Sequence, residues 1–370
     1  MSGSRARTRP TGSASSGRSR TTYPESIGAS FGSFNTSKLS LQLDLKHPVG
    51  NDVARRLLAW CDIAIDSFTA GTMDRLGMGY EAARELNPDI IMATTCLFGQ
   101  SGPAAELAGY GYHAAAISGF YEVTGWTDRA PGGPWNAYTD TIAPRFLTTT
   151  LMAALDHRRR TGEGQYIDQA QMESALHFLA PELLEVQLSG HSARRNGNHD
   201  PDRSPHDAYP CAGTDQWCAI AVETDEQWRA LRSLLGNPPW AARPELDTLS
   251  GRQEHADEVD HHLAAFTANH EPLELMAKLQ EVGVPAGMVQ RSSDHLEDPQ
   301  LAHRRFFRPM EHAEMGEVPY EGHQYTIRDY DNGPRMPAPC LGQHTYEVLT
   351  EVLGIDGDEV AEILVSGACG

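Results

Sequence analysis

The feature that most constrains the fold is a regular alternation of short apolar runs with amphipathic helical stretches in the first third of the chain. Val53, Leu57 and Leu58 share one face at helical spacing, whereas the runs on either side are apolar or alternate apolar with polar positions. Strands that alternate with helices in this way predict a parallel sheet with right-handed crossovers, an α/β fold. The expected strands are 38–45, 61–66 and 89–99, and the expected helices are 49–61 and 80–87.

A second alternation predicts the rest of the first domain. Residues 146–160 are expected to form a helix with a basic last turn, which suits the helix dipole, and the glycines of "TGEG" end it. A short strand over 165–168 and a long helix over 171–188 follow, with Pro181 as the point where that helix would kink. Ligands of such sheets bind in loops at the carboxyl ends of strands, here 67–80 and 99–111.

Composition predicts the domain boundaries. Residues 192–210 are rich in Asn, Asp, Pro and His without any period, so we expect a linker. A Rossmann-like large domain over 28–191 precedes it, and a smaller α+β domain over 211–330 follows, including a hairpin over 209–222. Segment 331–370 is expected to return to the large domain. Residues 1–27 are predicted to be a disordered Arg/Ser-rich tail, because residues 1–22 hold five arginines and no acid.

Charge and residue usage exclude several classes of function. A net charge of −20 argues against a nucleic-acid or anionic-membrane surface, which needs clustered Lys and Arg. No apolar run approaches the length of about 18 residues that spans a bilayer, and no secretory signal is visible, which favours the cytoplasm. The six cysteines and sixteen histidines show no ligand spacing, so no metal is expected.

Five stretches, in order, resemble the class III CoA-transferase family (CaiB/BaiF type), which includes formyl-CoA transferase, carnitine CoA-transferase and α-methylacyl-CoA racemase. The resemblance implies transfer of coenzyme A from an acyl-CoA to a carboxylic acid through an aspartyl anhydride and an aspartyl-CoA thioester. It also implies an interlocked homodimer, with acyl-CoA as a substrate and no metal. The matching stretches are residues 35–50, 61–103, 154–168, 296–307 and 337–354.

Asp140 is the candidate catalytic residue. In that family a single aspartate lies ahead of the helix that ends in "RTGEGQ", and Asp140, in the stretch "NAYTDTIAPRF", falls on the matching position. A carboxylate suits the chemistry, since the thioester energy is kept through an anhydride, which a serine or cysteine ester would not match.

The resemblance also implies the residues that contact CoA. Lysine and arginine are suited to phosphates, and Phe68 to packing against adenine or pantetheine. Ser67 departs from the asparagine of many relatives. The implied contacts are Leu43, Lys46, Ser67, Phe68, Arg75 and Leu76.

Other departures separate the branches of the family. The racemase branch uses a histidine where this chain has Tyr110, and a phenol is a poor proton shuttle at neutral pH, so racemisation is disfavoured. His113, three residues on, is expected to be structural. The glycine-rich loop of formyl-CoA transferase has no counterpart, so the chain looks more like the carnitine type.

The strand–turn–helix with which family members open has no match before about residue 28. Removing a central strand would expose an apolar sheet edge and would remove contacts with CoA. Three alternatives therefore stay open beside the transferase: an acyl-CoA racemase or isomerase, a truncated non-catalytic homologue, and a partner subunit whose missing segment another chain supplies.

Overall fold

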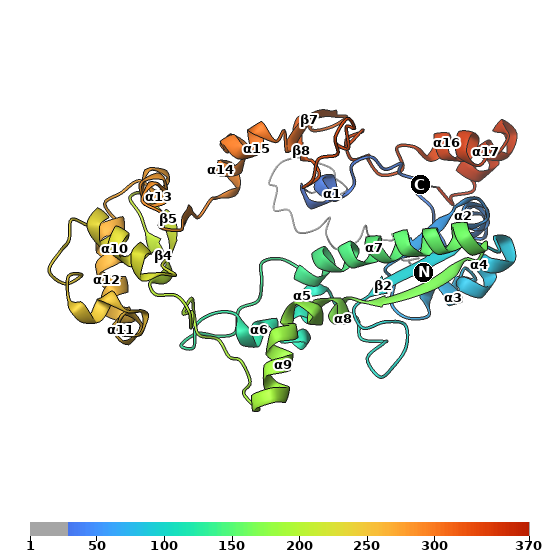
Figure 1. Cartoon of the computed structure of the whole chain (residues 1–370). Helices are drawn as coiled ribbons and strands as arrows, with labels where there is room; N and C mark the ends of the chain where they lie inside the picture. Colours follow the sequence, from blue (N-terminus) through green and yellow to red (C-terminus); the bar gives the residue numbers. More distant parts are fainter. Residues whose placement is uncertain (1–28, 370) are drawn as a thin grey trace, which may run out of the picture. The chain divides into compact units, whose positions relative to one another are not determined.

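The computed structural model describes residues 29–369, and the predicted tail over 1–27 lies outside them. The chain divides into two compact units (Figure 1). Of the described residues, the first holds 29–118, 135–180 and 296–369, and the second holds Gly119–Pro134 and Pro181–His295. The domain boundaries drawn from the sequence stay a prediction.

The first unit is built on a three-stranded parallel sheet, as the sequence predicts. Its order is β1 (Ile63–Asp66), β2 (Ile91–Cys96) and β3 (Gln165–Ala170), and Ile91 pairs with both Ile63 and Gln165. Every residue of β2 is buried, which explains why this strand is an unbroken run of apolar and small residues. The long helix α7 (Tyr138–Thr161) packs along β2 and β3 (Figure 1).

The predicted strand over 38–45 is wrong. Among the described residues no strand pairs with this segment, and its backbone instead follows the end of the chain. Ser40 accepts a hydrogen bond from the amide of His344 at 2.9 Å, and the amide of Asp44 donates to Ala368 O at 2.8 Å. The alternation has another cause, because Leu41 and Leu43 pack against a cluster of C-terminal side chains.

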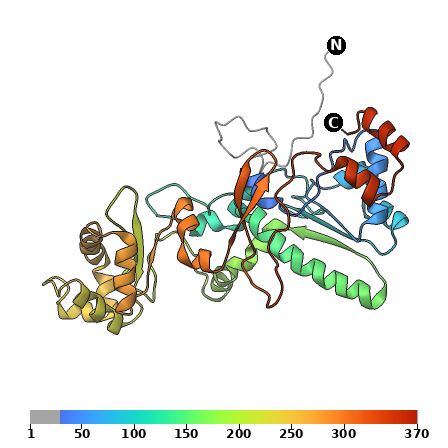
Figure 2. The ribbon, with the colours of Figure 1, turned by 90° about the horizontal axis from the view of Figure 1, so that it is seen from above.

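That cluster joins the C-terminal segment to α2 (Pro48–Trp60). His47 caps α2 by accepting from the amide of Val49, and the helix buries Val53 completely. The partners of Val53 come from the π-helix η4 (Val348–Val352) and from α17 (Gly357–Val365). Figure 2 shows these C-terminal helices beside α2.

Helix α7 begins eight residues before its predicted start at 146. Pro144 lies inside the helix, where it lacks the amide that would bind the carbonyl of Asp140. This proline made 136–145 look like a loop, but tertiary packing carries the helix through it. Asp140 therefore lies in the first turn of α7 rather than ahead of the helix, and Gly162 in the left-handed conformation ends the helix as expected.

The expected long helix over 171–188 is divided just before Pro181, where a 3₁₀ turn separates two α-helices. A hairpin of β7 (Phe307–His312) and β8 (Gly316–Glu321) completes the strands of this unit. The remaining helices of this unit are α1 (Ala29–Phe34), α3 (Thr72–Arg75), α4 (Tyr80–Leu86), α5 (Gly111–Ser118), α8 (Gln171–Leu176), η2 (His177–Leu179), α15 (Pro299–His303) and α16 (Thr345–Glu347). All of α9 (Ala180–Ser189) after its first residue belongs to the second unit, and α14 (Ser292–Glu297) crosses the boundary between the units.

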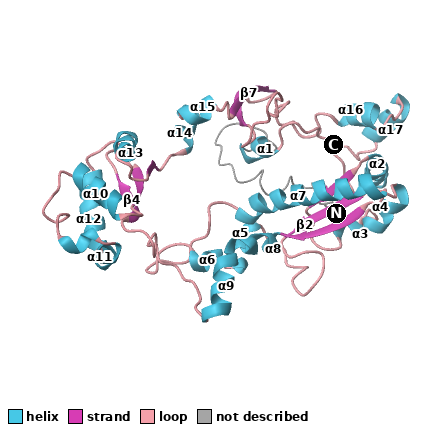
Figure 3. Ribbon diagram, in the orientation of Figure 1, coloured by secondary structure: helices cyan, strands magenta, loops and turns pink. Residues whose placement is uncertain are grey.

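The second unit is α+β, with its own antiparallel sheet (Figure 3). The predicted hairpin is β4 (His206–Pro210) with β5 (Trp217–Ala221), and β6 (Ala286–Met288) adds to β5. The core gathers around Trp228 and Leu263, both fully buried. Its helices are α6 (Phe120–Val123), α10 (Asp225–Leu234), η3 (Pro244–Asp247), α11 (Leu249–Glu254), α12 (Ala256–Thr267) and α13 (Pro272–Glu281). No helix within 29–369 is long and apolar enough to cross a membrane.

Candidate active site

The candidate site lies along the carboxyl edge of the parallel sheet. Because β1, β2 and β3 run in the same direction, the segments that follow them emerge at one edge. These segments are the loop from Ser67, the loop after Cys96 that leads to α5, and the start of α8. Ligands of parallel sheets bind at this edge.

Asp140 lies between the N-termini of two helices. Its side chain is exposed, in the first turn of α7, and its Oδ2 accepts the backbone N–H of Gly111 at 3.2 Å. Gly111 is the first residue of α5. The positive ends of two helix dipoles therefore face one carboxylate, an arrangement that stabilises negative charge.

A buried hydroxyl ties this carboxylate to the sheet. Thr139 is fully buried, and its Oγ1 lies 3.2 Å from Gly111 O and 3.0 Å from Oε1 of Gln171. Gln171 directly follows β3. Helix α5 also approaches α7 closely, because a Cβ on Gly111 would lie 2.8 Å from Ala137 O and 2.9 Å from the amide nitrogen of Asp140.

The loop after β1 holds two of the implied CoA contacts, Ser67 and Phe68, and both side chains are exposed. Asp66 fixes the start of the loop by accepting the amide of Phe68 at 3.0 Å. Further along, Gln100 accepts the amide of Gly71 at 3.1 Å and donates to Thr94 of β2 at 2.9 Å. The loop is therefore attached to the sheet at both ends.

Arg75 lies beside this loop on α3. Its guanidinium donates to Ala70 O at 3.3 Å and to Oγ1 of Thr72 at 2.7 Å, and the side chain stays exposed. Leu76 instead packs into a cluster with the buried Leu58 and Met78. The cation is thus available to an anionic ligand, whereas Leu76 supports the turn that carries it.

Asn51 brings the segment of Lys46 next to α3. Its side-chain amide donates to Leu76 O at 2.8 Å and to Leu45 O at 3.3 Å. Lys46 is exposed beside this junction. The structure therefore brings Lys46 together with the Arg75 loop, whereas the side chain of Leu43 packs in the C-terminal cluster and serves the core.

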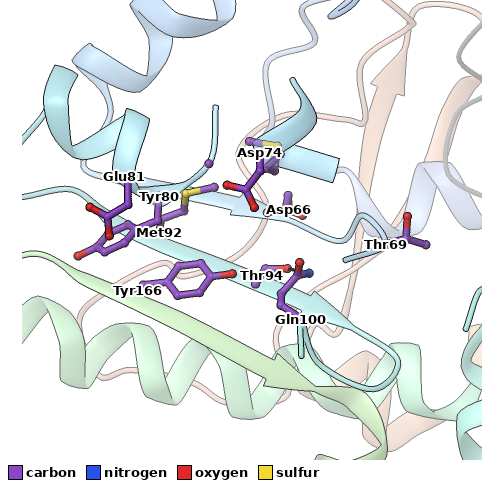
Figure 4. Close-up of a pocket in the computed structure, with 11 residues that line it drawn as sticks. Asp66, Thr69, Asp74, Tyr80, Glu81, Met92, Thr94, Gln100 and Tyr166 are labelled. Atoms are coloured by element: carbon purple, nitrogen blue, oxygen red, sulfur yellow. Dashed lines mark hydrogen bonds between the residues drawn. The ribbon is translucent and has the colours of Figure 1, made fainter. Parts of the chain in front are cut away.

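A pocket of about 200 Å³ lies on the sheet face covered by α3 and α4 (Figure 4). The rings of Tyr80 and Tyr166 stack at one end, with centroids 5.2 Å apart. Burial, together with the nearby Asp168, raises the pKa of Tyr166 to about 12, so its phenol stays a proton donor at neutral pH. The pocket is lined by Asp66, Thr69, Met73, Asp74, Gly79, Tyr80, Glu81, Met92, Thr94, Gln100 and Tyr166.

Tyr110 precedes α5, and His113 lies in its first turn. The amide of Tyr110 donates to Nδ1 of His113 at 3.1 Å, and the amide of His113 donates to Tyr110 O at 2.8 Å. His113 therefore fills the structural role expected of it, and the side chain of Tyr110 is 58 % exposed.

Sequence reasoning missed the residues that hold the site in place. Gly111, Thr139 and Gln171 come from three segments, and Gln100 and Thr94 attach the β1 loop. The only sequence signal for any of them is that Gly111 ends the loop over 99–111, which the alternation of strands and helices already marks as ligand-facing.

Known proteins resemble this chain over most of its length. The model of CoA-transferase family III matches residues 8–345. The succinyl-CoA–D-citramalate CoA-transferase of Chloroflexus aurantiacus is 32 % identical over 325 residues, 88 % of this chain and 81 % of that protein. The succinate–glutarate CoA-transferase of Agrobacterium fabrum is 31 % identical over 322 residues, 87 % of this chain and 80 % of that protein. A CaiB/BaiF family protein from Brucella suis has a crystal structure with a TM-score of 0.81 at 30 % identity, covering 88 % and 84 % of the two chains.

The fold and these matches define a CoA-transferase. The chain belongs to CoA-transferase family III. The family, the α/β fold and the class of enzyme expected from the sequence are therefore confirmed, and CoA thioesters are its substrates.

Asp66 makes the stability of this site depend on pH. Burial raises the pKa of Asp66, against the opposing effect of its hydrogen bonds from Phe68 and Thr94. A raised folded-state pKa means that the favourable, protonated form is lost as the pH rises through it. Asp66→Asn keeps an acceptor for Phe68 and cannot ionise, so we expect it to be more stable than the wild type at pH 7.

Urea unfolding between pH 4 and pH 8 measures this effect. The stability difference should shrink toward pH 4, as Asp66 becomes protonated in the folded state. Asp202→Asn, an exposed position in the second unit, is the control and should show no such trend. A difference that does not change with pH would contradict the assignment.

Proposed function

We propose that Asp140 is the nucleophile that carries the acyl group and then CoA. The observation that supports it is the hydrogen bond from the amide of Gly111 to Oδ2, at the meeting point of two helix N-termini. This bond holds one carboxylate oxygen and leaves Oδ1 as the oxygen that attacks. The position also matches the family's catalytic aspartate.

The reaction then has two covalent stages. Oδ1 attacks the carbonyl of the acyl-CoA and expels CoA thiolate, which gives a mixed anhydride. The thiolate attacks Cγ of Asp140, the Cγ–Oδ1 bond breaks, and the donor acid leaves as a carboxylate. An aspartyl-CoA thioester remains, and the acceptor carboxylate reverses both steps to leave as the new acyl-CoA.

The acids that this chain exchanges are, in our proposal, small dicarboxylic acids. The two relatives above are named for the CoA esters or acids of succinate, glutarate and citramalate. Each relative covers most of this chain at about one third identity. A panel of such acids is therefore the first set of acceptors to test.

CoA is proposed to lie along the loop after β1. Lys46 and Arg75 are exposed cations on adjoining segments, suited to its phosphates. Phe68 is 43 % exposed beside them and offers an aromatic face. Ser67 and the backbone around Leu43 and Leu76 complete the contacts that the family resemblance implies.

The active form is proposed to be a homodimer, which the family resemblance implies to be interlocked. Helix α9 supports a self-association surface, since none of its residues is buried. Four apolar residues of this helix are exposed: Leu183 at 45 %, Leu184 at 58 %, Val186 at 43 % and Leu188 at 85 %. Soluble monomers rarely leave large apolar patches uncovered.

Asp140→Asn should abolish transfer. The amide has the same shape but is not a nucleophile, so we expect the rate of CoA transfer to a dicarboxylic acid to fall by roughly 10⁴ or more. Asp156→Asn, on the exposed face of α7, is the matched control and should keep near-wild-type activity. Hydroxylamine should trap a hydroxamate on the Asp140 peptide of the wild type only.

Two outcomes contradict this proposal. Equal transfer by wild type and Asp140→Asn would remove Asp140 from the mechanism. If the wild type transfers CoA to no acid and gives no hydroxamate with any succinyl-type thioester, the chain is a non-catalytic relative.

Lys46→Ala should raise the KM for acyl-CoA about tenfold and leave kcat nearly unchanged. One charge-assisted hydrogen bond to a phosphate contributes about 1.5–3 kcal/mol, and solvent exposure places this one at the lower end. Initial rates over a range of acyl-CoA concentrations measure it, with Lys278→Ala on α13 as the control. A fall in kcat without a change in KM would argue against phosphate binding.

A double charge on α9 should dissociate the dimer. Leu184→Glu with Leu188→Glu places two carboxylates in the proposed contact. The control, Ser189→Glu, adds one carboxylate on the side of the same helix that carries Glu182 and Glu185. Light scattering after gel filtration should give a dimer for wild type and control and a monomer for the double variant. A wild-type monomer would exclude the dimer.

A further inference from the structure

We infer that the backbone N–H of Gly111 is a catalytic donor to the carbonyl oxygen of the Asp140 intermediates, and that Thr139 is the positioning residue for it. This inference rests on the proposed function, because it assumes that Asp140 becomes acylated. It extends that function by assigning the group that stabilises charge on the enzyme's own carbonyl.

The two oxygens of Asp140 have different fates in the reaction. Oδ1 attacks and leaves with the donor acid, and an oxygen of the acceptor acid replaces it. Oδ2 never leaves, and it becomes the carbonyl oxygen of the anhydride and then of the thioester. Each attack on Cγ places a negative charge on Oδ2, which is the atom that Gly111 N–H contacts at 3.2 Å.

A preorganised N–H is suited to this charge. Gly111 opens the eight-residue helix α5, so the positive end of its dipole adds to the hydrogen bond. Amide donors that point at a developing oxyanion need no reorganisation during the reaction, and the loss of one typically slows catalysis about 10²-fold or more.

Residues 139 and 140 hold Gly111 from both sides of its α-carbon. The carboxylate of Asp140 accepts from the N–H of Gly111, and the hydroxyl of Thr139 lies 3.2 Å from its carbonyl oxygen. The preceding peptide is fixed as well, since Tyr110 O accepts from the amide of His113. A glycine fits here, because a Cβ would lie 2.8 Å from the carbonyl oxygen of Ala137, the N-cap residue of α7.

Thr139 has no freedom to move away. It is 0 % exposed, and its single hydroxyl hydrogen is shared between Gly111 O and Oε1 of Gln171, which is 8 % exposed at the end of the sheet. The carboxyl edge of β3 thus sets the position of the Gly111 peptide through one side chain. Loss of this hydroxyl should let the N–H shift with respect to Oδ2.

Thr139→Val and Thr139→Ser separate this role from packing. Valine keeps the shape and removes the hydroxyl, whereas serine keeps the hydroxyl and removes a methyl group. The measurement is the single-turnover rate of aspartyl-CoA formation, followed by rapid quench and mass spectrometry of the Asp140 peptide with succinyl-CoA. The KM for succinyl-CoA and the thermal midpoint are measured in parallel.

We expect Thr139→Val to slow adduct formation about tenfold with an unchanged KM, since a small misplacement of a catalytic group has effects of this size. Thr139→Ser should stay within about twofold of the wild type. Gly111→Ala should slow the same step even though it keeps the N–H, and Gly132→Ala, where a Cβ has open space, should not.

A backbone variant at position 111 removes the N–H donor itself. Glycolic acid incorporated at position 111 replaces the N–H by oxygen and adds no atom, so it should slow adduct formation about 10²-fold. This variant keeps Thr139 and therefore tests the assignment even where Thr139→Val fails to fold.

The outcomes separate the two proposals. A wild type that forms no adduct on Asp140 overturns the proposed function. A wild type that forms it at the same rate as the glycolate variant overturns the role of Gly111 alone. Equal slowing by Thr139→Val and Thr139→Ser would overturn the positioning role, because packing would then explain it.

Discussion

The complete burial of β2 is the constraint on which the rest of the first unit depends. A strand with no exposed residue needs a neighbour at each edge and cover on each face, and β1, β3 and α7 provide much of this. Because the three strands are parallel, their carboxyl ends meet at one edge. The β1 loop, the loop to α5 and Gln171 all lie at that edge. The arrangement that buries β2 therefore also places the residues of the candidate site.

The strands and helices that the sequence predicted correctly are those in which apolar residues recur at the spacing of a buried strand or helix face. The strands near Ile63 and Ile91 and the helix over Val53 were predicted correctly, because a buried strand or helix face leaves a local pattern. This signal misled the prediction at residues 38–45. Apolar and polar residues alternate there because an extended segment packs against the C-terminal helices, not because it belongs to a sheet. The start of α7 was missed because Pro144 is a local helix breaker that tertiary contacts override.

Some residues of the candidate site could be predicted from the sequence and others could not. Asp140 could be proposed because the family resemblance implies an aspartate at this spacing from "RTGEGQ", and α7 spans that distance. Thr139, Gly111 and Gln171 could not, since their hydrogen bonds join residues about 30 positions apart that no local pattern relates. The resemblance implies that Leu43 contacts CoA. Its side chain packs against the C-terminal cluster, so that contact is proposed for the backbone and stays a prediction.

The groups that face Asp140 also bear on transfer versus racemisation. A racemase needs a second proton-transfer group beside its aspartate, whereas the group that contacts the Asp140 carboxylate here is the backbone N–H of Gly111. The imidazole of His113 accepts the amide of Tyr110 at Nδ1, so it stabilises the start of α5. An N–H donor cannot remove a proton from carbon, but it stabilises an oxyanion formed at Cγ. The local backbone of α5 therefore favours acyl-group chemistry at Asp140 over proton abstraction.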